Sequence, residues 1–141
     1  MTTTESIYRV FRSTWGIHIG IVASYTALSD DAYSREAVKL GEGIHINDRQ
    51  VQADPQSALL PDEQAFLQAG LRRVSSLILR HSEYGNRTLI VVSSVTIAPC
   101  DFQAEGLEAA MMHWASEAFG FELPQFEVEF DEAKNRYEFR M

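Results

Sequence analysis

The sequence predicts an α+β fold, a two-layer α/β sandwich in which two long helices cover one face of a mostly antiparallel sheet and a C-terminal β-hairpin follows. Three observations predict it. Short segments of alternating or β-branched apolar residues recur along the chain, two helical segments each have one apolar face, and the last segment alternates apolar with charged residues. Because elements with one apolar face must bury it, about five or six strands and two helices are expected to form one unit.

The length of the chain predicts a single domain over residues 1–141. A chain of this length buries about 68–70% of the surface that it exposes when unfolded, so it folds without disulfides or a metal. The composition is that of a globular protein, with 45% hydrophobic and 23% charged residues. Only residues 1–5, which are polar and rich in threonine, are expected to be flexible.

The first third of the chain predicts three strands and one short helix. Residues 6–12, 17–25 and 43–48 are rich in β-branched and aromatic residues, and a turn joins the first two segments. Residues 29–43 are expected to contain a short helix, which Gly41 ends.

The middle of the chain predicts a long helix followed by a central strand. Pro61 stands at a favoured first-turn position, and Asp62 and Glu63 lie near the positive end of the helix dipole. The apolar face of this helix, expected over residues 61–83, contains Leu67, Gly70, Leu71, Val74, Leu77 and Ile78. Residues 88–97 form an almost unbroken β-branched run, which is typical of a strand inside a sheet.

A second long helix is expected to end near Phe119, before the hairpin. Asp101 is expected to accept hydrogen bonds from the free backbone N–H groups at its start, and Glu105 adds negative charge there. In the hairpin that follows, apolar side chains occupy one face of both strands. Glu127 and Glu129 occupy the outer face, where they can pair with the arginines of the second strand.

The charge of the chain limits its partners. The formal net charge is -8 and the isoelectric point is about 4.9, which argues against a nucleic-acid partner because phosphate binding requires Lys and Arg. This charge favours a basic protein partner or serves only solubility. No apolar run approaches the ~18 residues of a membrane span and no signal-peptide pattern is present, so no membrane association and a cytoplasmic location are expected.

The sequence contains none of the common catalytic motifs. The patterns GxxxxGK[ST], GxGxxG, HExxH and GxSxG are missing. Cys100 is the only cysteine, which excludes an intramolecular disulfide and a zinc site with several cysteines. A pair of Cys100 and His113 is disfavoured because His113 lies about 18 Å along its helix from the turn, at about 1.5 Å per residue. The expectation is therefore a protein without catalytic residues and without a cofactor.

Two similar segments, GIHIG and GIHIN, place His18 and His45 on strands between isoleucines. The isoleucines are expected to face the core and the histidines the other side of the sheet. If the two strands are neighbours, the histidines meet, with Asp48 nearby, in a metal or proton site. If they are not, both histidines simply face solvent. The candidate binding residues are His18, His45, Asp48, Glu127 and Glu129.

The order of motifs over residues 41–119 resembles a known domain. GEGIHIND precedes LLPDEQAFLQAGLRR, then VVSSVTI, then CDFQAEGLEAAMMHWASEAF. This order resembles the fourth domain of translation elongation factor G. The residues that carry the resemblance are Pro61, Gly70, Leu71 and Arg72 in the first helix, Val95, Thr96 and Ile97 at the strand end, Phe102 in the turn, and Ala110, Ala115 and Phe119 in the last helix.

The resemblance implies a fold like that of the second domain of ribosomal protein S5. This fold occurs in many unrelated proteins, so it does not by itself indicate a function. The chain also departs from the family. It has no GTPase domain and no long basic tip loops, and AEGLE replaces the family's Asp-Ser-Ser-Glu before the last helix. The C-terminal hairpin lies outside the match.

Three functions follow as expectations. The first is a non-enzymatic, acidic interaction domain that binds a macromolecule, a protein in the first instance, for example in an immunity- or inhibitor-type role. The second is a small enzyme or metal-binding protein with a His18 and His45 site on the open sheet face. The third is a ribosome- or translation-associated factor. Homodimerisation through an edge strand or through the hairpin is left open.

Overall fold

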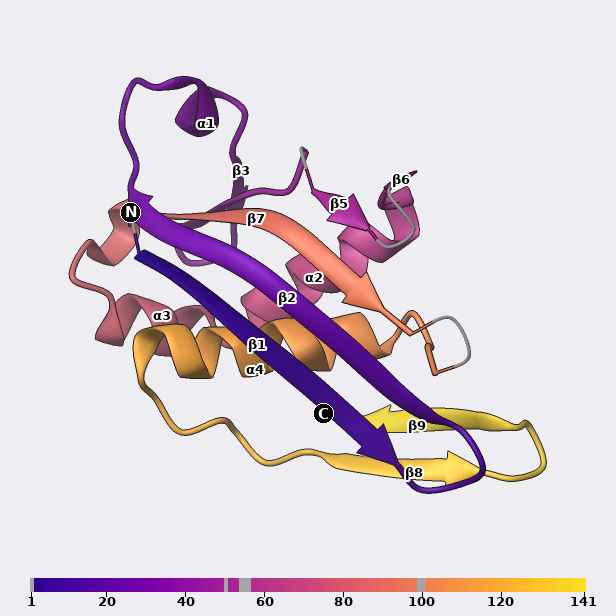
Figure 1. Ribbon diagram of the computed structural model, residues 1–141. Coiled ribbons are helices and arrows are strands. Elements are labelled where there is room, and N and C mark those ends of the chain that lie inside the picture. Colours follow the sequence, from indigo (N-terminus) through magenta and orange to yellow (C-terminus); the bar gives the residue numbers. More distant parts are fainter. Residues whose placement is uncertain (1, 50, 54–56, 99–100) are drawn as a thin grey trace.

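The computed structural model describes residues 2–49, 51–53, 57–98 and 101–141 (Figure 1). Its main sheet has the strand order β1-β2-β7-β4-β3, and the short strand β5 pairs with both β7 and β6. The strands are β1 Thr2–Phe11, β2 Gly16–Ala27, β3 Val38–Leu40, β4 Ile44–Asn47, β5 Gln52–Ala53, β6 Ser57–Ala58 and β7 Thr88–Ile97. The predicted α+β class is therefore confirmed.

Most strand pairs of the main sheet are antiparallel, as predicted. β2 pairs antiparallel with β1 on one side and with β7 on the other. β4 and β5 run parallel to β7. A parallel pair needs a long crossover connection, and here the chain passes through two helices between β4 and β7.

Helices α2 Pro61–Arg73, α3 Ser75–His81 and α4 Gly106–Phe119 cover one face of the sheet (Figure 1). The short helix α1 Ala32–Arg35 and the 3-10 helix η1 Gly85–Arg87 lie in connections between strands and helices. The single helix predicted over residues 61–83 is two helices, because Val74 leaves the helical conformation with φ -113° and ψ 13°. The Ser75 hydroxyl donates to the Arg72 carbonyl oxygen at 3.0 Å, a local hydrogen bond that competes with regular helix geometry.

Thr2 to Glu5, for which flexibility is expected, lie in β1 and pair with β2, and a threonine-rich segment suits a strand that has a partner. One expectation for the first 43 residues is wrong. The helix expected over residues 29–43 is reduced to α1, and β3 follows it. Gly41 and Gly43, with φ of 47° and 98°, form the turn that brings β3 onto β4. Residues 38–40 are therefore a strand because they pair with β4.

The hydrophobic core lies between the sheet and the helices. The buried residues come from one face of β2, β4 and β7 and from the apolar faces of the helices, and the predicted face of α2 and α3 is part of it. The largest fully buried side chains include Trp114, Ile17, Ile19, Ile21, Ile44, Ile46, Leu67, Leu71 and Ile78. None of the helices in the described ranges is long and apolar enough to cross a membrane.

The C-terminal hairpin is a separate two-stranded sheet, as predicted. It consists of β8 Glu127–Asp131 and β9 Arg136–Arg140. Tyr137 anchors it, because this side chain is only 1% exposed and its hydroxyl donates to the Trp15 carbonyl oxygen at 2.7 Å. The same hydroxyl accepts the Arg12 N–H at 2.8 Å. The hairpin is therefore fixed to the β1–β2 turn.

Candidate interaction surface

The two histidines do not share a site. Both point away from the core, as predicted, because the isoleucines beside them are buried. However, β7 lies between their strands. His45 pairs with Leu89 near the start of β7, whereas His18 lies beyond the pair that Ile19 makes with Ile97. The two positions are thus on the order of 26 Å apart along β7, at about 3.3 Å per residue.

Asp48 has a structural role at the end of β4. Its side chain is buried, with the residue 4% exposed, and its Oδ2 accepts the Gln68 side-chain N–H at 3.1 Å. Its backbone carbonyl accepts the Gln64 side-chain N–H at 3.1 Å. These contacts hold the strand end on α2. In the part of the chain that the structure describes, no three His, Cys, Asp or Glu residues are placed to hold a metal ion.

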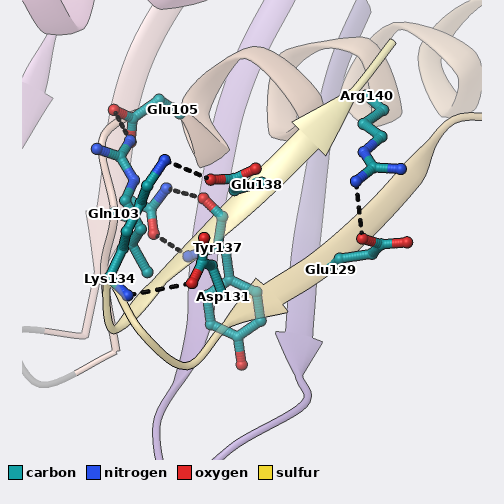
Figure 2. Close-up of polar contacts among 9 residues, drawn as sticks. Gln103, Glu105, Glu129, Asp131, Lys134, Tyr137, Glu138 and Arg140 are labelled. Atoms are coloured by element: carbon teal, nitrogen blue, oxygen red, sulfur yellow. Dashed lines mark hydrogen bonds and ion pairs between the residues drawn. The ribbon is translucent and has the colours of Figure 1, made fainter.

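Glu127 and Glu129 lie on the exposed outer face of the hairpin, as predicted. Arg140 approaches both. Its Nη2 lies 3.1 Å from the Glu129 carboxylate (Figure 2), and its Nη1 lies 3.9 Å from the Glu127 carboxylate. Glu138, the cross-strand neighbour of Glu129, lies 3.4 Å from the Lys134 ammonium. Such exposed ion pairs contribute roughly 0–1 kcal/mol each. A binding role for these glutamates stays a prediction.

The segment before α4 ties the hairpin to the main body. Gln103 binds the Tyr137 backbone twice, by donating to its carbonyl oxygen at 2.6 Å and accepting its N–H at 2.7 Å (Figure 2). Arg136 lies 2.7 Å from the Glu105 carboxylate. The expected capping of α4 by Asp101 is wrong, since α4 begins only at Gly106. Asp101 accepts the Gly16 N–H instead, at 3.0 Å.

His113 lies over the outer strand of the sheet. Its Nε2 is 2.7 Å from the Glu117 carboxylate, and its ring centre is 6.1 Å from that of Tyr8 on β1. The side chain is partly covered, with 29% of it exposed. Cys100, the other half of the disfavoured pair, lies outside the described residues.

The edge of β1 is a surface that the sequence prediction did not locate, since it left an edge strand open as an interface without naming the strand. β1 is ten residues long and is the outermost strand on its side of the sheet. The His18 N–H donates to the Asp101 carbonyl oxygen at 3.0 Å, away from β1. His18 pairs with Arg9, so this pair is one without hydrogen bonds between the strands. By the alternation of an antiparallel ladder, the backbone groups of Glu5, Ile7 and Arg9 point outward from the sheet.

The side chains of β1 divide between the two faces of the sheet. Ile7 and Phe11 lie on the helix-free face and are 44% and 72% exposed. On the helix side Ser6 and Val10 are buried, and burial raises the pKa of Tyr8 to about 12, against an opposing effect of the Arg12 charge.

A groove of about 560 Å³ runs along the same strand, lined by Ile7, Tyr8, Arg9 and His113. The groove adjoins the edge where the backbone groups of β1 point outward. One signal in the sequence could have indicated an edge strand, because Glu5 and Arg9 flank Ile7, and charges are common on edge strands.

Comparison with known proteins assigns no family. No protein-family model matches the chain, and a search against curated proteins finds no match. The resemblance of residues 41–119 to the elongation-factor domain is untested by these comparisons and stays a prediction. Function must therefore be inferred from the surface itself.

Proposed function

We propose that this protein is a non-enzymatic interaction domain that binds another polypeptide by taking one of its extended segments as a further strand on β1. The observation that carries the proposal is the unpaired backbone edge at Glu5, Ile7 and Arg9, beside the groove that His113 borders. In strand addition the main-chain hydrogen bonds supply affinity and the side chains supply specificity.

The side chains beside this edge define the strand that fits. Glu5, Ile7 and Arg9 form one row on the helix-free face. A strand that runs antiparallel to β1 meets Arg9 first, then Ile7, then Glu5. Opposite charges stabilise a cross-strand pair and like charges destabilise it. The partner segment therefore carries an acidic residue, an apolar residue and a basic residue at alternate positions.

Other observations agree with a binding role rather than with catalysis. The pKa shifts among the described residues have structural causes. Burial raises the pKa of Tyr8, hydrogen bonds from Ser34 lower the pKa of Asp31, and the nearby Glu83 charge raises the pKa of Tyr84. The net charge of -8 suits a cytoplasmic protein that stays soluble, and a cytoplasmic location is part of the proposal. The resemblance of residues 41–119 to the elongation-factor domain does not imply an enzymatic activity, because one fold serves many functions.

A pair of synthetic peptides tests the proposal. One is a threonine-rich decapeptide with Glu, Ile and Arg at alternate central positions, and the other has Glu and Arg exchanged. The first is expected to bind the wild-type protein at least tenfold more tightly, measured by fluorescence anisotropy of the labelled peptide.

Two variants locate the binding. Ile7→Lys is expected to abolish peptide binding because a charge then faces the apolar residue of the peptide, whereas Val38→Lys is expected to retain it. Val38 lies on the opposite edge of the sheet and has the same exposed fraction, 44%. Equal binding of the two peptides, or equal effects of the two variants, would contradict strand addition at β1.

A further inference from the structure

The strand pattern that fits β1 is present in β1 itself. Glu5, Ile7 and Arg9 are an acidic, an apolar and a basic residue at alternate positions. We infer that the segment bound at this edge is β1 of a second copy, so that two chains form a dimer with two-fold symmetry and antiparallel β1 pairing. This inference rests on the proposed function, because it names the partner of the same edge.

One register satisfies the side chains and the backbone together. With the two-fold axis at Ile7, each Ile7 faces its counterpart, and Glu5 of each copy faces Arg9 of the other. The symmetry therefore gives two opposite-charge pairs. The facing residues are those whose backbone groups point outward, so they can exchange hydrogen bonds across the axis.

The neighbouring registers fit less well. An axis at Glu5 or at Arg9 places two like charges opposite each other. An axis at Ser6 or at Tyr8 places Ile7 opposite a charged residue. Both outcomes are unfavourable for cross-strand pairs, so the sequence of β1 specifies the register centred on Ile7.

The helix side of the paired strands is also complementary. In this register the large Tyr8 ring of one copy lies opposite the small Ser6 side chain of the other, and Val10 lies opposite Thr4. The groove between β1 and His113 provides the space that the second strand enters. On the other face, the exposed ring of Phe11 lies opposite Thr3 of the second copy. The two main sheets then become continuous.

Charge exchange tests this register. The wild-type protein is expected to have twice the chain mass of 15.9 kDa in sedimentation equilibrium. Glu5→Arg and Arg9→Glu each create two like-charge pairs, so each variant alone is expected to dimerise at least tenfold more weakly. An equal mixture of the two variants is expected to restore the dimer, because both pairs are then opposite in charge. The double variant is expected to dimerise like the wild type.

Each other result overturns the inference in a distinct way. Dimers that are insensitive to both single charge reversals use another surface, such as the hairpin. Variants that fail to recombine on mixing contradict the register, since the mixture requires only that each chain is folded. A monomeric wild type excludes the dimer. If that monomer still binds the matched peptide, strand addition at β1 stands, and if it does not, the proposed function is also wrong.

Discussion

At the scale of the residue, Tyr8 of β1 makes the stability of the folded protein depend on pH. Its ring packs against His113 on the helix side of β1, and burial raises its pKa from 10.0 to about 12. The folded protein therefore favours the neutral phenol more than the unfolded chain does. Since the pKa is raised on folding, the stabilisation is complete below pH 10 and is lost as the pH rises toward 12.

A denaturation series at alkaline pH tests this effect. Between pH 10 and 12 the wild type is expected to lose more free energy of unfolding than Tyr8→Phe, which has no phenol to ionise at this position. Tyr33→Phe, at an exposed position, is the control and is expected to follow the wild type. Parallel losses in the wild type and in Tyr8→Phe would show that the Tyr8 phenol is not linked to folding.

At the scale of the element, Gly70 sets the distance between α2 and α4. A Cβ atom on Gly70 would overlap the Glu108 carbonyl oxygen and lie 3.1 Å from the Met111 Cβ. Arg73, one turn further along α2, lies 2.6 Å from the Glu108 carboxylate across the same contact. The two helices therefore approach closely because the side chain is missing at this position.

The sign of the Gly70→Ala effect on stability tests this contact. In a helix with free space, replacing glycine by alanine stabilises by roughly 0.5–1 kcal/mol. Here we expect a net loss of about 1–2 kcal/mol, because overpacking costs about 1–3 kcal/mol. Gly20→Ala is the matched control, since the new Cβ lies 3.6 Å or more from its neighbours. Urea denaturation measures both, and a stabilised Gly70→Ala protein would contradict the close contact.

Local patterns predicted most elements of this fold but not their partners. The alternation in β2 and in the hairpin and the proline at the start of α2 gave the correct element types and faces. The break at Val74 coincides with one hydroxyl contact, from Ser75 to the Arg72 carbonyl oxygen, and β3 is a strand because it pairs with β4. The dependence on distant partners also explains why His18 and His45 do not share a site. His18 and His45 face the predicted side, but the order of strands, which places β7 between them, depends on contacts distant in the sequence.

At the scale of the whole molecule, the two sides of the main sheet differ. The side away from β1 ends in β3, which has three residues, and in β6, which has two, whereas β1 has ten. Short edge strands resist unwanted pairing, and long ones with unpaired backbone groups accept a further strand unless something covers them. β1 therefore has an edge that can accept a further strand, and the charges of Glu5 and Arg9 determine which strand fits there.

Amide hydrogen exchange along β1, followed by NMR, tests this account most directly. The amides of Glu5, Ile7 and Arg9 are expected to exchange more slowly as the protein concentration rises or as the matched peptide is added. The amides of Ser6 and Tyr8, which bond to β2, are expected to stay unchanged. Equally fast exchange of Glu5, Ile7 and Arg9 at every concentration and with the peptide would contradict strand addition at β1.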